Sequence, residues 1–113
     1  MSVIVDFMVV SDFMGEDRAM EEVNRELERL DTERHQQFRK IPVDDHAGGS
    51  KVFCQDVWAG AFNHLVPETI RQALCAGGWK FPDAVLVLEA SGDYEIELHA
   101  TSIEDLRKRL EAA

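Results

Sequence analysis

The sequence predicts a single α+β domain, residues 1–113, in which one antiparallel sheet of about five strands carries two helices on one face, with a C-terminal hairpin strand and helix added. Two observations lead to this prediction. Strand-like apolar segments alternate with amphipathic helical segments, and no repeat or linker interrupts them. At 113 residues and 45% apolar composition, the chain can bury one core but not two.

The N-terminal third is expected to form a central strand and an amphipathic helix. Residues 2–10 are β-branched and apolar on both faces except at Asp6, the pattern of a strand covered on most sides. Gly15 turns the chain, and the acidic residues after it favour a helix start. The apolar stripe of this helix recurs at steps of three and four and consists of Met20, Val23, Leu27 and Leu30.

The next segment is expected to form a hairpin. Residues 38–45 are compatible with a strand but contain Pro42, which restricts them to a sheet edge or a strand end. Residues 50–62 are expected to form an alternating strand, with Phe53 and Val57 on one side and Val52, Cys54, Asp56 and Trp58 on the other. Gly48 and Gly49 between the two segments supply the positive φ that hairpin loops need.

A second helix and a buried strand are expected to follow. Residues 63–78 are helical in pattern, with Pro67 suited to the first turn and Gly77 and Gly78 to the C-terminal end. The inner stripe is predicted to contain Val66, Ile70, Ala73 and Leu74. Residues 83–90 are apolar on both faces, as in a buried strand.

The chain is then expected to turn back into an alternating strand and a last helix. Residues 94–100 alternate strictly, with Tyr94, Ile96, Leu98 and Ala100 predicted to face inward. Ser102 is expected to cap the last helix, with Asp105 three residues on in the capping-box position.

The expected elements follow the order β-α-β-β-α-β-β-α. The first six resemble the split β-α-β arrangement of ferredoxin-like folds, in which two helices pack on one face of a sheet. The resemblance concerns the fold alone, and this fold hosts many unrelated functions. It implies that the other face of the sheet is open to solvent or to a partner.

Charge restricts the classes of partner. The formal net charge is -10, from 22 acidic and 12 basic residues. This charge disfavours direct binding to nucleic acid and to anionic membranes. It favours fast association with a basic protein partner, including proteins that themselves bind nucleic acid.

The sequence also predicts a cytoplasmic location. The N-terminal apolar run lacks a basic region and contains Asp6, so it has the pattern of neither a signal peptide nor a membrane span. Cys54 and Cys75 do not make a disulfide framework, and in a reducing compartment both are expected to be small core residues.

No motif of catalysis, cofactor binding or metal binding is complete. The four histidines are far apart in the chain, at His35, His46, His64 and His99. The cluster in the hairpin loop is a candidate for ligand binding, although its spacing differs from that of phosphate-binding loops, and its members are Asp44, Asp45, His46 and Lys51. We therefore expect no catalytic residue, cofactor or metal.

The polar residues of the predicted strands form a second candidate site. If they share the open face of the sheet, they make an acidic surface for a partner, comprising Asp6, Asp56, Glu95, Glu97 and His99. The simpler alternative is that these charges only keep an exposed strand face soluble. Asp6 is the most unusual of them, and should either face solvent or pair with Arg39, Lys40 or Lys51.

Three functions remain open. The favoured hypothesis is a non-enzymatic interaction module that inhibits or neutralises a basic protein partner through the open acidic face. The alternative is a small-molecule-binding or regulatory domain that forms a homodimer through its sheet, buries Trp58 there and leaves a pocket near Asp44, Asp45 and His46. An enzyme ranks third among these hypotheses, because several of the weak candidate residues would have to lie together in one cleft.

Overall fold

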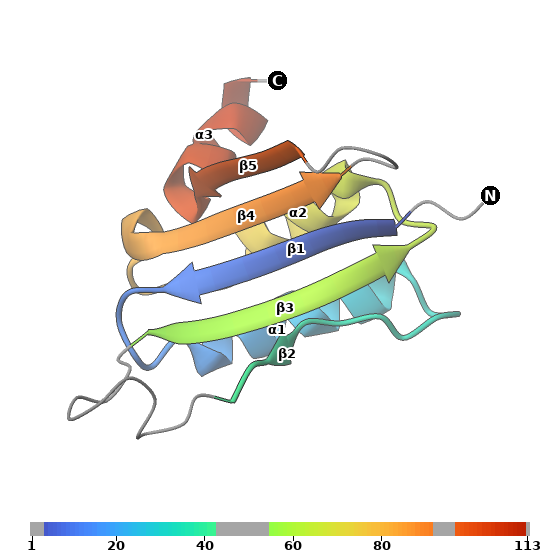
Figure 1. Cartoon of the computed structure of the whole chain (residues 1–113), viewed down its shortest axis with the longest axis horizontal. Coiled ribbons are helices and arrows are strands. Elements are labelled where there is room, and N and C mark those ends of the chain that lie inside the picture. The colour runs from blue at the N-terminus through green and yellow to red at the C-terminus, as the bar shows by residue number, and fades with distance from the viewer. Residues whose placement is uncertain (1–3, 43–54, 92–96, 113) are drawn as a thin grey trace.

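The computed structural model describes residues 4–42, 55–91 and 97–112, and within them it confirms an α+β fold with one five-stranded antiparallel sheet and three helices (Figure 1). The strands are β1 (Ile4–Ser11), β2 (Arg39–Lys40), β3 (Asp56–Asn63), β4 (Val85–Ser91) and β5 (Glu97–Ser102). The helices are α1 (Asp17–Leu30), α2 (Pro67–Ala76) and α3 (Ile103–Ala112), and a short 3₁₀ turn, η1 (Pro82–Ala84), leads into β4.

The strands lie in the order β2-β3-β1-β4-β5. β1 occupies the centre, as its apolar pattern predicts, and pairs antiparallel with both β3 and β4. β2 is a short edge strand just before Pro42, whose ring lacks the N–H that a longer ladder would need. In Figure 1, α1 and α2 lie behind the sheet and α3 lies at its β5 edge, and no described element covers the front face.

The core lies between the sheet and the helices. The inward positions of β1 are almost fully buried, as are Met20, Val23 and Leu27 of α1, in agreement with the alternation in the strand and the helical period. Phe7, Phe38 and Phe62 pack edge to face at its centre, with ring centroids 5.0 to 6.4 Å apart. Burial of such rings is a main source of the free energy of folding.

Both tryptophans belong to this core. Trp58 points from β3 toward the helices and meets Trp79 at a centroid distance of 6.2 Å. Trp79 Nε1 donates a hydrogen bond of 2.7 Å to the carbonyl oxygen of Leu74 at the end of α2. The indole N–H is thus satisfied although the ring is buried.

Two predicted turns and caps are confirmed. Gly15 has a φ of +99°, the left-handed region that favours glycine. The Ser102 hydroxyl accepts a 3.1 Å hydrogen bond from the backbone N–H of Asp105 and so caps α3. A third feature was not predicted: the buried carboxylate of Glu16 accepts hydrogen bonds from the N–H groups of Lys80 and Phe81, at 2.9 and 3.2 Å. This residue ties the start of α1 to the segment before β4.

Two residues of the predicted helix stripes are exposed. Val66 precedes the first turn of α2 with an extended backbone, so the helical period does not govern its side chain. Leu30 is the last residue of α1, where the chain leaves the helix. Both predictions failed because they extended a period beyond the part of the helix that packs on the sheet.

The predicted phase of β5 is also wrong. Ala100 pairs with Leu88 on the face away from the helices, whereas His99 pairs with Glu89 on the helix side. Strict alternation separates the two sets of side chains but does not say which set meets the helices. Tyr94, Glu95 and Ile96 lie outside the described residues.

Candidate functional site

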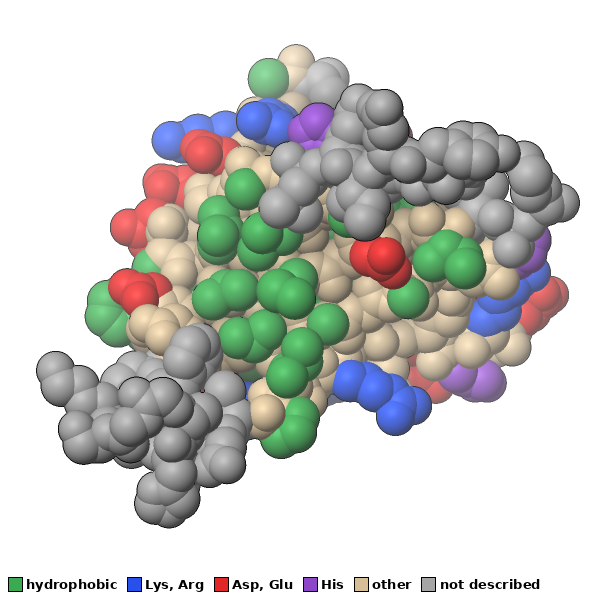
Figure 2. Space-filling view, viewed as in Figure 1, with side chains coloured by type: hydrophobic (Ala, Val, Ile, Leu, Met, Phe, Trp, Pro, Cys, Tyr) green, Lys and Arg blue, Asp and Glu red, His purple; other side chains and the backbone are tan. Residues whose placement is uncertain are grey.

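The face of the sheet away from the helices, here called the open face, is largely apolar. Alternation and register place these described residues on it: Ile4, Asp6, Met8, Val10, Arg39, Val57, Ala59, Ala61, Asn63, Leu86, Leu88, Ala90 and Ala100. Figure 2 shows hydrophobic side chains gathered over the central strands of this face. Exposed apolar patches of this kind mark interaction sites in soluble proteins.

The exposure of the large apolar side chains is substantial. Ile4, Met8 and Leu86 are 55%, 40% and 41% exposed, although each lies in a regular strand. Small residues between them, including Ala59, Ala61 and Ala90, leave a shallow hollow of about 580 Å³ beside Asp6. The open face therefore combines protruding apolar side chains with a depression into which a partner side chain could fit.

Asp6 lies in the middle of this face. It is exposed, and its neighbours across the two adjacent strands are Ala61 and Ala90. Of the two alternatives left open by the sequence, the structure shows solvent exposure, and no described residue forms an ion pair with it. Asp6 is the single carboxylate among the described residues of the open face.

Asp56 does not join Asp6. It is 7% exposed and lies on the helix side of β3, in the same phase as Trp58. Lys40 bridges Asp56 and Asp17, with Nζ–Oδ1 distances of 3.4 and 2.9 Å, and the hydrogen bond to Asp17 raises the pKa of Lys40. The placement of Asp56 on the open face was wrong, because Asp56 shares the phase of Trp58 and pairs with Ser11 on the helix side of the sheet.

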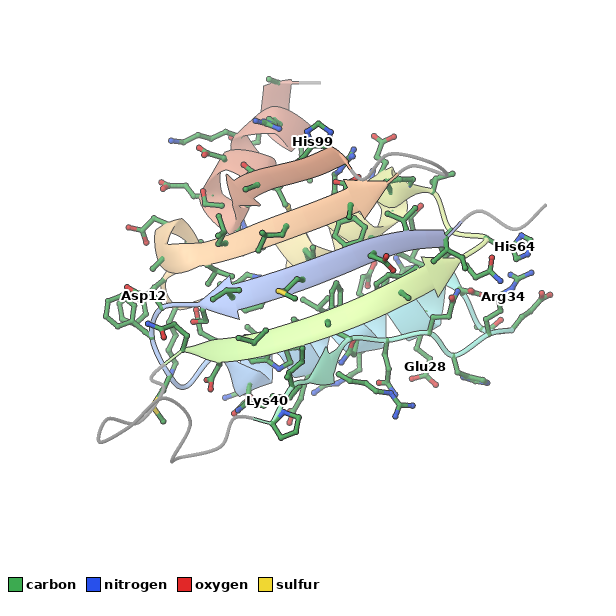
Figure 3. All side chains as sticks on the ribbon, viewed as in Figure 1. Asp12, Glu28, Arg34, Lys40, His64 and His99 are labelled. Carbon is green, nitrogen blue, oxygen red and sulfur yellow. The ribbon has the colours of Figure 1, made fainter. Side chains whose placement is uncertain are left out.

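His99 is also absent from the open face. Figure 3 shows it at the β5 edge of the sheet, and the register places it beside Glu89 on the helix side. Glu97 pairs with Ser91 at the start of β5. The predicted cluster of strand carboxylates is therefore not assembled by the described residues.

The remaining predicted site residues lie outside the described part of the chain. They are Glu95 and the loop residues Asp44, Asp45, His46 and Lys51. Their proposed roles stay predictions. Trp58, expected to be buried in a sheet-to-sheet dimer, is instead buried under the helices, so it is not a residue of the open face.

A charged pair that sequence reasoning missed lies on the helix side. Arg71 of α2 donates two hydrogen bonds to the carboxylate of Glu89 in β4, at 2.9 and 2.6 Å. These bonds raise the pKa of the Arg71 guanidinium, and Glu89 itself is only 7% exposed. The signal was present in the sequence, because Glu89, like Asp6, is a carboxylate inside an apolar strand.

Metal binding, a reactive cysteine and a membrane-spanning helix have little support among the described residues. None of their His, Cys, Asp and Glu side chains form a group of three that could hold a metal ion. Burial raises the pKa of the Cys75 thiol and outweighs the opposing effect of the nearby Arg107. The raised pKa disfavours the reactive thiolate form. Within the same ranges, every helix is too short or too polar to cross a membrane.

No protein-family model, curated protein or solved structure matches the chain.

Proposed function

We propose that the protein is a non-enzymatic interaction module that binds a basic protein partner through the open face and thereby inhibits or neutralises it. The exposed apolar surface of β1, β3 and β4 is the observation that carries this proposal. Covering it would remove apolar area from water, which is the main driving force of protein association. The contact is apolar at its centre and differs in this from the acidic face that the sequence predicts.

The position of Asp6 favours a partner that places a positively charged side chain opposite it. Any protein surface that covers the open face also buries this carboxylate, and a buried carboxylate without a partner is costly. Among the described residues of the open face, Arg39 is the single cation, at the β2 edge and separated from Asp6 by β3. A lysine or arginine of the partner opposite Asp6 would therefore complete the contact.

The net charge favours the same class of partner. At -10, two copies of the chain repel each other, whereas a basic protein is attracted and guided toward the face. The alternative, a homodimer through the open face with a regulatory or small-molecule-binding role, is supported by the apolar surface but opposed by this charge.

We also propose a ferredoxin-like core and a cytoplasmic location. The order β2-β3-β1-β4, with α1 and α2 in the two crossovers, supports the first proposal. The two cysteines, which are too few for a disulfide framework, support the second.

The test is affinity capture from native lysate at low and moderate salt with three baits. These are the wild-type protein, Asp6→Lys, and the control Glu21→Lys, which changes the charge equally on an exposed position of α1. We expect a basic protein on the wild type and on the control, released by salt, and lost from Asp6→Lys. The purified pair should then protect β1, β3 and β4 amides in hydrogen exchange.

Two results would contradict the proposal. Equal loss with Asp6→Lys and Glu21→Lys would show binding by overall charge rather than by the open face. A dimer of the wild type in sedimentation, dissociated by Met8→Asp, would assign the open face to a second copy instead.

A further inference from the structure

Three exposed apolar residues occur at the end of the sheet where β1 ends and β4 begins. Phe13 and Met14 belong to the turn after β1, and Phe81 directly precedes η1. The rings of Phe13 and Phe81 contact each other, with centroids 4.8 Å apart, yet the two residues remain 48% and 46% exposed, and Met14 is 72% exposed. We call these three residues the aromatic tip. Single exposed apolar residues are common on protein surfaces, but a group of them marks an interaction site.

Buried polar groups fix the backbone that carries the two rings. The Ser11 hydroxyl donates a 2.6 Å hydrogen bond to the carbonyl oxygen of Phe13, and the Glu16 carboxylate accepts one of 3.2 Å from the N–H of Phe81. Ser11 and Glu16 are each 1% exposed. Rings on such a fixed backbone lose little conformational entropy on binding, which is a property of the residues that dominate an interface.

The exposed charges beside the aromatic tip are mainly acidic. Figure 3 shows Asp12 where β1 ends, and the 3.1 Å hydrogen bond from its N–H to the Ala84 carbonyl oxygen joins this turn to the segment that carries Asp83. Both carboxylates are exposed, and neither forms an ion pair with another described residue. Lys80 is the opposing cation of this segment and offsets one of the two charges. Exposed ring surface beside carboxylates is complementary to an organic cation.

We infer that the aromatic tip binds an arginine side chain of the basic partner, which stacks on Phe13 and Phe81 while its N–H groups reach Asp12 and Asp83. A guanidinium is planar, weakly hydrated and rich in donors, so it can pack on a ring and bind a carboxylate at once. A lysine ammonium is strongly hydrated and has no flat surface. The carboxylates disfavour an anionic bilayer, the other surface into which exposed apolar turns insert.

The inference rests on the proposed function, because it names a further contact of the same partner. Val10 and Leu86 pair on the open face at the end of β1, and Phe13 follows Val10 by three residues. A partner seated on the open face is therefore adjacent to the aromatic tip and can cover both surfaces.

The first experiment titrates the full-length protein, observed by NMR, with three capped hexapeptides that alternate leucine with arginine, lysine or citrulline. Citrulline keeps the shape of arginine without its charge. We expect the arginine peptide to shift the ring resonances of Phe13 and Phe81 and to bind about threefold more tightly than the lysine peptide, with the citrulline peptide weakest. Equal affinities for the arginine and lysine peptides, or shifts that spare both rings, would overturn the inference.

The second experiment removes the rings but keeps apolar area, by combining Phe13→Leu with Phe81→Leu. The double variant should bind the arginine and lysine peptides alike, whereas Val66→Ala, at an exposed apolar residue before α2, should keep the preference for arginine. Asp83→Asn should weaken both cationic peptides more than Glu21→Gln, at an exposed carboxylate of α1. A preference for arginine that survives the loss of both rings would refute the stacking.

Affinity capture separates this inference from the proposed function. A basic protein lost from Asp6→Lys but retained by the double variant would leave the proposed function standing and overturn this inference. A capture without any basic protein would contradict the proposed function, while the peptide titration still decides whether the rings select arginine. Sedimentation of the wild type with vesicles of phosphatidylcholine and phosphatidylserine, lost in Phe13→Ser, would assign the aromatic tip to a membrane instead.

Discussion

At the scale of single residues, two carboxylates in apolar strands have opposite roles. Asp6 faces solvent in the middle of the open face, whereas Glu89 is buried on the helix side and held by Arg71. The sequence context of the two is similar, because each interrupts a run of aliphatic residues. The difference comes from which face each occupies and from whether a cation on a neighbouring element can reach it.

The Arg71–Glu89 pair gives the first stability prediction. Arg71→Met keeps much of the side-chain length but leaves the Glu89 carboxylate buried without its two hydrogen bonds. We expect the free energy of unfolding at neutral pH to fall by about 2 kcal/mol, a value that allows for the partial exposure of Arg71. Urea denaturation would measure it.

The control for this prediction is Arg29→Met. Arg29 also pairs with a glutamate, Glu26, but within α1 and in solvent. Its loss should lower the free energy of unfolding far less than the loss of Arg71, because solvent screens an exposed pair. If both substitutions lowered the free energy of unfolding equally, the burial of Glu89 would not make the Arg71–Glu89 pair more important for stability than an exposed pair.

At the scale of elements, the contact between α1 and α2 depends on a glycine. A Cβ on Gly77 would lie 2.9 Å from the Ala19 carbonyl oxygen and 2.9 Å from Val23 Cγ2, both in α1. Gly77 has an ordinary extended backbone, so the need for glycine here is close approach rather than a positive φ. The helix α2 ends at Gly77, as the sequence predicts, and the structure adds close approach to α1 as a reason for glycine at this position.

Gly77→Ala should therefore destabilise the protein by about 1 to 3 kcal/mol, because the helix backbone must move apart to admit a methyl group. Gly78→Ala is the matched control, since its Cβ would first meet the mobile end of Glu22 at 3.0 Å. Thermal unfolding of both variants would test this. A smaller effect of Gly77→Ala than of Gly78→Ala would contradict the packing argument.

At the scale of the whole molecule, a large net charge coexists with an apolar face. The charge of -10 at neutral pH opposes the association of two copies through the open face. We predict that the protein self-associates through this face as the pH approaches its isoelectric point near 4.7, where the repulsion disappears. Light scattering against pH would follow the association.

The variant for this test is Met8→Lys, which puts a charge at the centre of the open face. Gln72→Lys adds the same charge on the outer side of α2 and serves as the control. Met8→Lys should suppress association near the isoelectric point, and Gln72→Lys should only shift its pH. If both variants associate alike, another surface is responsible.

The sequence by itself determined the local features of this protein. The period of α1, the proline at the edge of β2, the glycine turn at Gly15 and the Ser102 cap all depend on a few neighbouring residues, and all were predicted. The α+β class and the single antiparallel sheet followed from the order of these elements. Short-range steric and hydrogen-bonding preferences are sufficient for such features.

Only the tertiary structure decided which face each strand residue occupies. Alternation predicts that His99 and Ala100 lie on opposite faces. The packing of the helices on one face of the sheet determines that His99 lies on the helix side and Ala100 on the open face. The packing of the helices also determines that Asp56 lies on the helix side, beside Lys40, and that Asp6 lies on the open face among apolar side chains. A period of two is symmetric with respect to the two faces of a sheet, and long-range packing of the helices alone breaks that symmetry.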